Sequence, residues 1–185
     1  TGLGRIAAIA RLHTLDLSYV PLVDADLGHL GKLARLEKLQ LAFTGVTDAG
    51  LVHLAPLARL TALDLRGTAV NGVGLGQLAH LPKLKTLDLS CSHVDDAGLA
   101  GVTLLTRVEA LDLSFSQVTD AHVGQLAANK DLKSLSLIGT QMTDRGIEEL
   151  EALTDLRSLV LRRTALSNAA VAQLRKALPK CTIER

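Results

Sequence analysis

LEKLQLAFTGVTDAGLVHLAPLAR, residues 36–59, is the segment that decides the fold, because variants of it recur every 24 residues without an insertion. We number the first residue of each copy as column one. Aliphatic residues then recur at columns one, four, six, eleven, sixteen, nineteen and usually twenty-two. Self-similarity at a fixed period of this length is typical of a repeat protein. The seven copies open at Leu12, Leu36, Leu60, Leu84, Val108, Leu132 and Leu156.

The spacing within each copy predicts one short strand followed by one short helix. Columns four and six lie two residues apart, so their side chains point to one face of a strand, while columns three, five and seven face the other way. Columns sixteen, nineteen, twenty and twenty-two have helical spacing. Column twelve holds good N-cap residues, such as Thr47 and Asp95, and column thirteen usually holds an Asp whose charge suits the first helical turn.

Two further columns carry small or polar residues. Column nine is Thr or Ser in six of the seven copies, as in Thr44 and Ser92, and its hydroxyl can bond neighbouring backbone groups, so we expect a stacked hydroxyl ladder. Column fifteen is often glycine, as in Gly50 and Gly98. Because glycine lowers helix propensity, we expect it to serve close packing between stacked helices.

The pattern Leu-x-x-Leu-x-Leu-x-x-Thr/Ser, usually followed by Val-Thr-Asp-Ala-Gly-Leu, resembles leucine-rich repeats. In particular it is similar to the 24-residue repeats of bacterial proteins, including plant-pathogen effectors. The resemblance covers essentially the whole chain. It implies an α/β fold: a right-handed solenoid of about seven repeats, with a parallel β-sheet on the concave side and helices on the convex side. It also implies an interaction module, sometimes fused to a catalytic domain.

We expect a single domain over residues 1–185, because a lone repeat has nothing to bury its aliphatic side chains against. Residues 1–11 form a partial first repeat, residues 12–179 the seven full repeats, and residues 180–185 a terminal strand with Ile183 in column four. The chain opens inside a helix, at Leu3, which favours a further segment upstream, such as a signal peptide, a catalytic domain or a capping segment. The other end resembles a natural terminus.

Composition limits the classes of partner. The 185 residues are 48% hydrophobic, 21% charged and only 2% aromatic, with a net charge of +1. No apolar run approaches the roughly 18 residues of a membrane span, and no basic-then-apolar segment opens the chain, so we expect no membrane contact. Basic residues are not interleaved with stacking aromatics, which argues against nucleic acid. Location in the cytoplasm and secretion into a host cell both fit.

The two cysteines are not expected to pair. Cys91 lies in the fourth repeat and Cys181 beyond the seventh. A disulfide tolerates a Cα separation of only about 7 Å, less than several repeats span. Two unpaired cysteines favour a reducing compartment, although a secreted effector would look the same.

Column five places carboxylates on the exposed face of the predicted sheet. Asp64, Asp88 and Asp112 are consecutive in it and would lie about 4.8 Å apart. Like charges at that distance raise the carboxylate pKa values or invite a counter-charge. In one interpretation Leu-Asp-Leu is simply the repeat consensus, with Arg66 two residues from Asp64. In the other, the column is a site for a basic ligand or a cation.

Column eight contains all three aromatic residues of the chain, Tyr19, Phe43 and Phe115, accompanied by Cys91. Aromatic side chains at a partly exposed edge are typical of interaction hot spots. The alternative is that this column is half-buried under the following loop and accepts any large apolar residue. Glycine or arginine fills the column in the other repeats, so filling is not obligatory.

Charge is uneven along the chain. From residue 156 onward there are seven basic residues and one acidic residue, which leaves 13 basic and 18 acidic residues before it. Arg162 and Arg163 fall in columns seven and eight, so the concave face would run from acidic and aromatic to basic. This arrangement favours a partner of matching bipolar charge. The alternative is a charged cap that keeps the last repeat soluble.

The pattern predicts no catalytic residue, metal site or cofactor. The six histidines fall in unrelated columns, and although His29 and His53 share column eighteen, no carboxylate or thiolate is placed beside them. We therefore expect a non-enzymatic, monomeric module that binds a protein or peptide on its concave face. The alternatives are the targeting domain of a larger bacterial effector or signalling enzyme, and a spacer that self-associates end to end. The predicted binding residues are Tyr19, Phe43, Asp64, Arg66, Asp88, Cys91, Asp112, Phe115, Arg162 and Arg163.

Overall fold

Eight short parallel strands form one sheet in which strand order follows sequence order. The computed structural model describes residues 2–6, 8–9 and 11–185. The strands are β1 (Thr14–Asp16), β2 (Lys38–Gln40), β3 (Ala62–Asp64), β4 (Thr86–Asp88), β5 (Ala110–Asp112), β6 (Ser134–Ser136), β7 (Ser158–Val160) and β8 (Thr182–Glu184). Adjacent strands pair at an offset of 24 residues, as Leu39 does with Leu63, so the sequence period is the structural repeat.

The helices are short, and most are 3₁₀ helices. They are α1 (Gly2–Ile6), η1 (Asp24–Lys32), η2 (Asp48–Leu54), η3 (Leu75–Leu78), α2 (Leu99–Thr103), η4 (Val123–Ala128), η5 (Asp144–Gly146), α3 (Ile147–Glu151) and α4 (Asn168–Ala177). The predicted helix in each repeat is confirmed. Its tighter form fits columns sixteen, nineteen and twenty-two, because a 3₁₀ helix has three residues per turn.

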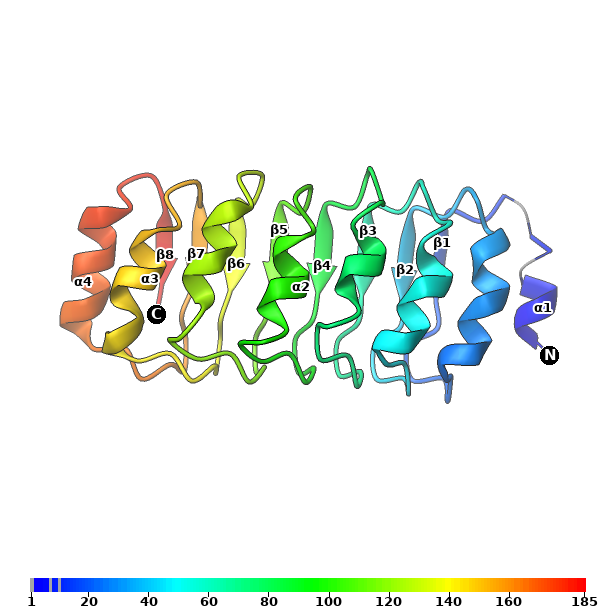
Figure 1. The fold of residues 1–185 in the computed structure, drawn as a ribbon, viewed down its shortest axis with the longest axis horizontal. Coiled ribbons are helices and arrows are strands. Elements are labelled where there is room, and N and C mark those ends of the chain that lie inside the picture. The colour runs from blue at the N-terminus through cyan, green and yellow to red at the C-terminus, as the bar shows by residue number, and fades with distance from the viewer. Residues whose placement is uncertain (1, 7, 10) are drawn as a thin grey trace.

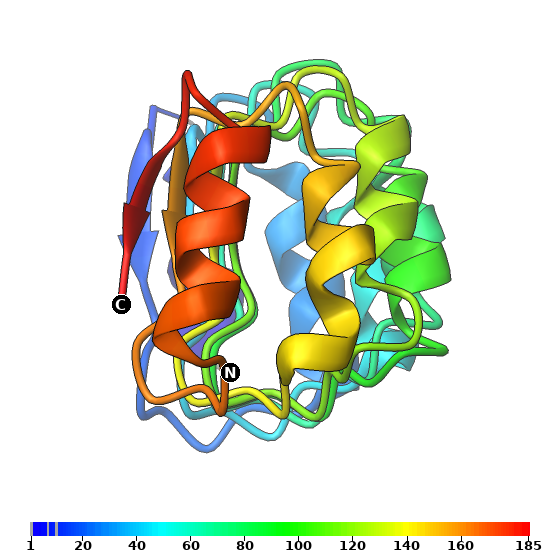
Figure 2. The ribbon, with the colours of Figure 1, turned by 90° about the vertical axis from the view of Figure 1, so that its left-hand side faces the viewer.

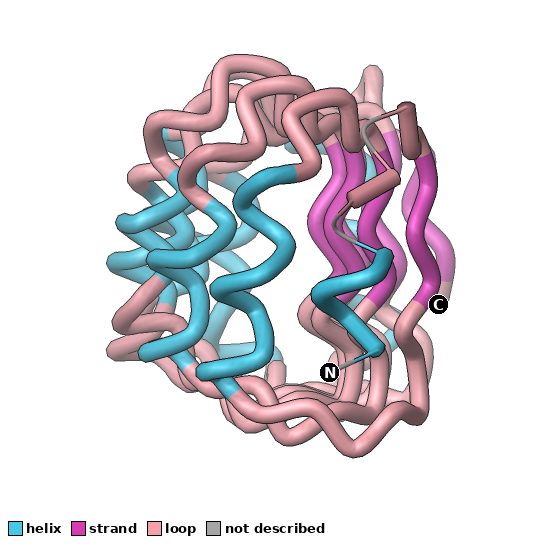
Figure 3. Tube along the Cα trace, turned by 90° about the vertical axis from the view of Figure 1, so that its right-hand side faces the viewer, coloured by secondary structure: helices cyan, strands magenta, loops and turns pink. Residues whose placement is uncertain are grey.

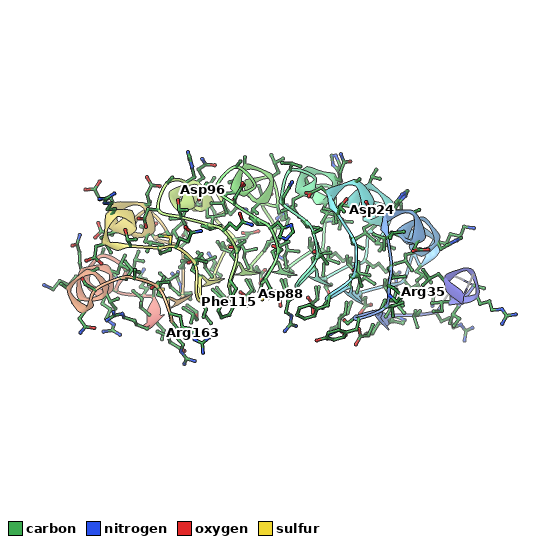
Figure 4. The ribbon with its side chains drawn as sticks, turned by 90° about the horizontal axis from the view of Figure 1, so that it is seen from below. Asp24, Arg35, Asp88, Asp96, Phe115 and Arg163 are labelled. Carbon is green, nitrogen blue, oxygen red and sulfur yellow. The ribbon has the colours of Figure 1, made fainter. Side chains whose placement is uncertain are left out.

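The repeats stack into an open, curved solenoid. Figure 1 shows them following one another along the long axis, with the two chain ends at opposite ends of the array. Seen along that axis, the sheet forms one wall and the helices the other, with loops joining them at both edges (Figure 2 and Figure 3). The array bends with the sheet on its inner side (Figure 4). The predicted solenoid with a concave parallel sheet and convex helices is confirmed.

Aliphatic side chains fill the space between the two walls. In the second repeat, Leu39 and Leu41 point inward and are fully buried, while Gln40 between them is exposed. Leu51 of η2 packs toward them from the helical wall and is also fully buried. The same columns of every repeat join one continuous apolar cluster. Each such side chain stabilises the fold by about 1.5–3 kcal/mol, and it does so only against neighbouring repeats.

Column-nine hydroxyls close the turn that follows each strand. Thr44 Oγ1 donates to the carbonyl oxygen of Leu41 at 2.7 Å, and the same bond recurs in most repeats. Ser116 is the exception, because its buried hydroxyl has no hydrogen-bond partner among the described residues. The expected bonding to backbone is confirmed, but each bond stays within its own repeat. These hydroxyls therefore do not link one repeat to the next.

Column-thirteen aspartates make the link between repeats. Oδ1 of Asp120 accepts the backbone N–H of Thr143 at 2.7 Å, and Oδ2 accepts the hydroxyl of Thr143 at 2.5 Å. Thr143 Oγ1 in turn caps the next helix by accepting the N–H of Arg145 at 3.2 Å. The predicted N-cap is confirmed at Thr143, whereas α2 begins later than predicted, with Gly98 rather than Asp95 as its N-cap. The column-thirteen aspartate also has a second role across the repeat boundary. Equivalent bonds join Asp24 to Thr47, Asp48 to Asn71, Asp96 to Thr119 and Asp144 to Ser167.

This row of aspartates is interrupted between the third and fourth repeats. Column thirteen of the third repeat is Gly72, with φ of +103°. Within the described residues, the backbone N–H of Asp95 therefore has no carboxylate acceptor at this junction. The two repeats instead approach backbone to backbone, because a Cβ on Gly98 would collide with the carbonyl oxygen of Asn71. The expected role of column-fifteen glycine in close packing is confirmed here.

Candidate functional site: the concave face and its rim

Column eight is a left-handed turn in all seven full repeats. Its φ angles lie between 55° and 65° at Tyr19, Phe43, Gly67, Cys91, Phe115, Gly139 and Arg163. Glycine adopts this conformation freely, whereas any other L-residue loses about 1–2 kcal/mol there. We did not predict this conformation, because tyrosine and phenylalanine do not favour it. The two glycines in the column were the available signal.

The aromatic side chains of column eight project into solvent. Tyr19 is 75% exposed, Phe43 44% and Phe115 48%. Tyr19 is largely exposed, whereas Phe43 and Phe115 are about half-buried, so the hot-spot and packing interpretations of this column both stay predictions. The core does not reach these rings, and the backbone at these positions favours glycine. Neither of them therefore accounts for aromatic residues in this column.

The first two aromatic residues form one platform on the rim. The rings of Tyr19 and Phe43 stack with their centroids 5.0 Å apart and their planes 14° apart. The ring of Phe43 lies over Gly67 of the next repeat, where a Cβ would collide with it. Stacking and this glycine together hold both rings in place. We call Tyr19 and Phe43 the N-terminal platform.

The third aromatic residue forms a second platform in the same way. The ring of Phe115 lies over Gly139, where a Cβ would come within 2.6 Å of the ring. The guanidinium of Arg163 lies 5.9 Å from the centroid of Phe115, on the concave side of the array (Figure 4). We call Phe115 and Arg163 the C-terminal platform. Cys91, an exposed free thiol, lies in the repeat between the two platforms.

The carboxylates of column five are held by their own turns. Oδ1 of Asp64 accepts the backbone N–H of Arg66 at 2.9 Å, and Oδ1 of Asp88 accepts the N–H of Ser90 at 2.8 Å. Asp112 makes the same bond in the fifth repeat. The Arg66 side chain lies between two carboxylates, 3.1 Å from Asp64 and 3.7 Å from Asp88. These contacts favour the interpretation of column five as a structural consensus with a built-in counter-charge.

Two groups on this face have shifted pKa values. The hydrogen bond and charge of Asp64, with a smaller contribution from Asp88, raise the pKa of Arg66. On β1, hydrogen bonds from the backbone and side chain of Ser18 lower the pKa of Asp16. Among the described residues, Asp16 forms no ion pair. Its negative charge at neutral pH therefore has no cationic partner there.

Open hollows adjoin the N-terminal platform. One has a volume of about 410 Å³ and includes Asp16, Tyr19, Gln40 and Asp64 in its lining. A second, of about 500 Å³, extends over β1 to β4 and shares Gln40 and Asp64 with the first. The N-terminal half of the concave face thus combines a polar floor with an aromatic rim.

Most of the basic character of the last repeat is used within the fold. Arg162 forms an ion pair with Glu184 of β8 at 2.8 Å, and Arg175 donates to the carbonyl oxygen of Ile183 at 3.2 Å. Glu184 offsets the charge of Arg162 locally, and the contribution of Arg162 to a basic binding surface stays a prediction. These contacts favour the charged-cap interpretation. Arg163 differs, since it has no ion pair among the described residues.

The described ranges contain no cluster of three or more His, Cys, Asp and Glu side chains arranged to hold a metal ion. No helix in them has the length and apolar character needed to cross a bilayer. Cys91 and Cys181 are both free thiols, as their separation predicted.

Comparison with known proteins agrees with the fold. Residues 80–102 match the family model described as Leucine Rich repeat, and no curated protein matches the chain. An internalin (inlF) from Listeria monocytogenes superposes with a TM-score of 0.75 and 24% identity, over 98% of this chain and 49% of that one. An internalin C2 (inlC2) from the same organism gives 0.70 and 26%, over 98% and 72%.

The chain therefore spans about half the length of the first internalin and most of the second. Folds of this kind generally serve protein–protein interaction. One conclusion follows from three findings: the family-model match over residues 80–102, the unbroken 24-residue register of the strands, and the structural likeness to internalins. The chain is a solenoid built of leucine-rich repeats.

Proposed function

We propose that this protein is an interaction module that binds another protein or a peptide on its concave face and column-eight rim. The observation that supports this most directly is the presence of three exposed aromatic side chains in left-handed turns where the fold accepts glycine. Backbone strain of this kind persists where function requires it. Aromatic side chains also contribute a large share of the energy of protein interfaces.

The geometry of the rim suits recognition. Stacking on Phe43 restrains Tyr19, and the glycines under both phenylalanine rings let them lie flat against the backbone. Groups that are already ordered lose little conformational entropy on binding, so more of the contact energy contributes to affinity. The adjoining hollow supplies polar partners, among them Gln40 and Asp16. Protein interfaces usually combine apolar and polar surface and are enriched in aromatic residues, as this face is.

Affinity capture tests the proposal. The wild-type chain and a variant carrying Tyr19→Gly, Phe43→Gly and Phe115→Gly are used on native and candidate-host lysates, and captured proteins are quantified by mass spectrometry. Glycine is chosen because Gly67 and Gly139 occupy the same turn, so the variant keeps the backbone. We expect one protein to be enriched by the wild type and lost by the variant, with direct binding then confirmed by calorimetry on purified components.

A matched control lies on the helical wall. Val52 and Leu104 are exposed apolar residues there, 47% and 55% accessible, and Val52→Ser with Leu104→Ser removes apolar surface without touching the rim. This control should capture the same protein as the wild type. If the glycine variant retains the partner, or the control loses it, the concave rim is not the binding surface.

Two alternatives stay predictions. The targeting domain of a larger bacterial effector or signalling enzyme is consistent with the greater length of both internalins, and a catalytic domain in the same reading frame would support it. End-to-end association would appear as a molar mass that rises with concentration in light scattering.

A further inference from the structure

The two platforms and the charges around them specify the kind of segment that fits the rim. We infer that the partner contributes an extended segment lying across the strands, with two apolar side chains four residues apart, a basic residue toward β1 and an acidic residue toward β7. This inference rests on the proposed function and adds the chemistry and spacing of the ligand.

The distance between the platforms sets the spacing. Phe43 is in the second repeat and Phe115 in the fifth, and both rings lean over the glycine that follows them by 24 residues. Adjacent strands of a sheet lie about 4.8 Å apart, so three repeats separate the rings by about 14 Å. An extended chain advances about 3.4 Å per residue, with residues i and i+4 on one face and about 14 Å apart. Spacings of two or six residues miss by about 7 Å.

A helical ligand fits this distance poorly. An α-helix rises 1.5 Å per residue, and the residues that share a face with residue i are about i+7 and i+11. These lie about 10 Å and 16 Å along the axis, and neither spacing matches the platforms. Each repeat also contributes no more than one side chain to the rim, so these side chains form a single row. A single row suits an extended backbone.

The charges left unpaired give the segment a direction. Asp16 shares its hollow with Tyr19 and has no ion pair among the described residues. At the other end Arg163 lies over Phe115, also without an ion pair in the described chain. The rim is therefore negative at the first repeat and positive where the Arg163 guanidinium lies, over the ring of Phe115. Four to five repeats separate these charges, about 19–24 Å, which an extended chain covers in about six or seven residues.

The remaining charges of this face do not reverse that direction. Arg66 is shared by Asp64 and Asp88, a group that leaves one negative charge in the N-terminal half. Lys38 of β2 offsets one negative charge of the N-terminal half, and Asp112 of β5 lies in the same repeat as Phe115, so both weaken the charge difference but leave the N-terminal half the more negative. A basic residue of the ligand thus meets the acidic half, and an acidic residue meets Arg163.

A displayed library of random 12-residue peptides tests the inference. Peptides are selected on the immobilised full chain and counter-selected on the Phe43→Gly, Phe115→Gly variant, whose fold is checked by circular dichroism. We expect the enriched peptides to share apolar residues at i and i+4 with a basic residue on one side and an acidic residue on the other. For a synthetic representative, each single glycine substitution should weaken binding by about ten-fold or more.

Shifted peptides and a charge-swapped chain complete the test. Moving the second apolar residue to i+2 or i+6 should weaken binding as much as a glycine substitution. The Asp16→Lys, Arg163→Asp variant should select peptides with the two charges exchanged.

The outcomes separate this inference from the proposed function. Two results would overturn the inference and leave concave-face binding standing. In the first, the selected peptides need Gln40 and Asp64 of the hollow but tolerate both glycine substitutions. In the second, the peptides show no fixed spacing. Peptides insensitive to every concave variant, or a library that yields no binder, would overturn both.

Discussion

Replacing Asp120 by alanine should destabilise the junction between the fifth and sixth repeats. The substitution removes the acceptors of the Thr143 N–H, at 2.7 Å, and of its hydroxyl, at 2.5 Å, and leaves a part-buried N–H without its partner. A hydrogen bond to a charged group contributes about 1.5–3 kcal/mol to stability. Because water reaches this half-buried site and replaces part of what is lost, we expect the free energy of unfolding to fall by about 2–3 kcal/mol in total.

Urea denaturation followed by circular dichroism measures this loss, and hydrogen exchange at the Thr143 amide shows where it acts. Asp120→Asn keeps one acceptor oxygen and should lose about half as much. Asp131→Ala is the surface control, since its ion pair with Arg107 is long, at 3.9 Å, and exposed pairs contribute about 0–1 kcal/mol. If Asp120→Ala and Asp131→Ala are equally stable, the aspartate does not hold the repeats together and the reasoning fails.

Three further predictions follow from the turns and the aspartate row. Phe115→Gly should be more stable than Phe115→Ala by about 1 kcal/mol in urea titrations, because glycine relieves the left-handed turn; the reverse order would contradict that conformation. Hydrogen bonds from Ser167 lower the pKa of Asp144 below its ordinary 3.8. The ionised Asp144 side chain therefore stabilises the fold above pH 3.8, and this stabilisation is lost as the pH falls through the lower pKa of the folded state. In Asp144→Asn, the midpoint of urea unfolding should therefore fall less steeply as the pH drops below 3.8, and an unchanged pH dependence would refute the linkage. The Asp95 amide, which lacks a carboxylate acceptor, should exchange with deuterium faster than the Thr119 amide, and equal rates would show that the interruption at Gly72 has no effect.

The strands and the core could be predicted because the spacing of the leucines specifies them. Leu39 and Leu63 lie one period apart, and they pair directly in adjacent strands. The type of helix could not be predicted in the same way. Leu51, Leu54 and Leu57 are spaced by three, which suits both an α-helix and a 3₁₀ helix, and only the backbone geometry separates the two.

The rim residues could be named from the sequence, but their conformation and partners could not. The pattern placed Phe43 and Gly67 in one column, yet it did not show that this column is left-handed or that the ring lies on the glycine. Helix-capping rules gave Asp120 a local role, whereas its bonds reach a residue 23 positions further along. Contacts between repeats depend on side-chain direction, which periodicity does not encode.

The left-handed turns of column eight keep ligand choice apart from folding. Glycine, cysteine, tyrosine, phenylalanine and arginine all occupy the same turn, so exchanging one for another alters stability by only about 1–2 kcal/mol and leaves the leucine core untouched. A truncation at column four, by contrast, opens a cavity and removes about 2–5 kcal/mol. The array therefore offers seven positions, about 4.8 Å apart, at which specificity can be changed by mutation or by design, provided that Gly67 and Gly139 are changed together with the phenylalanine whose ring lies over each.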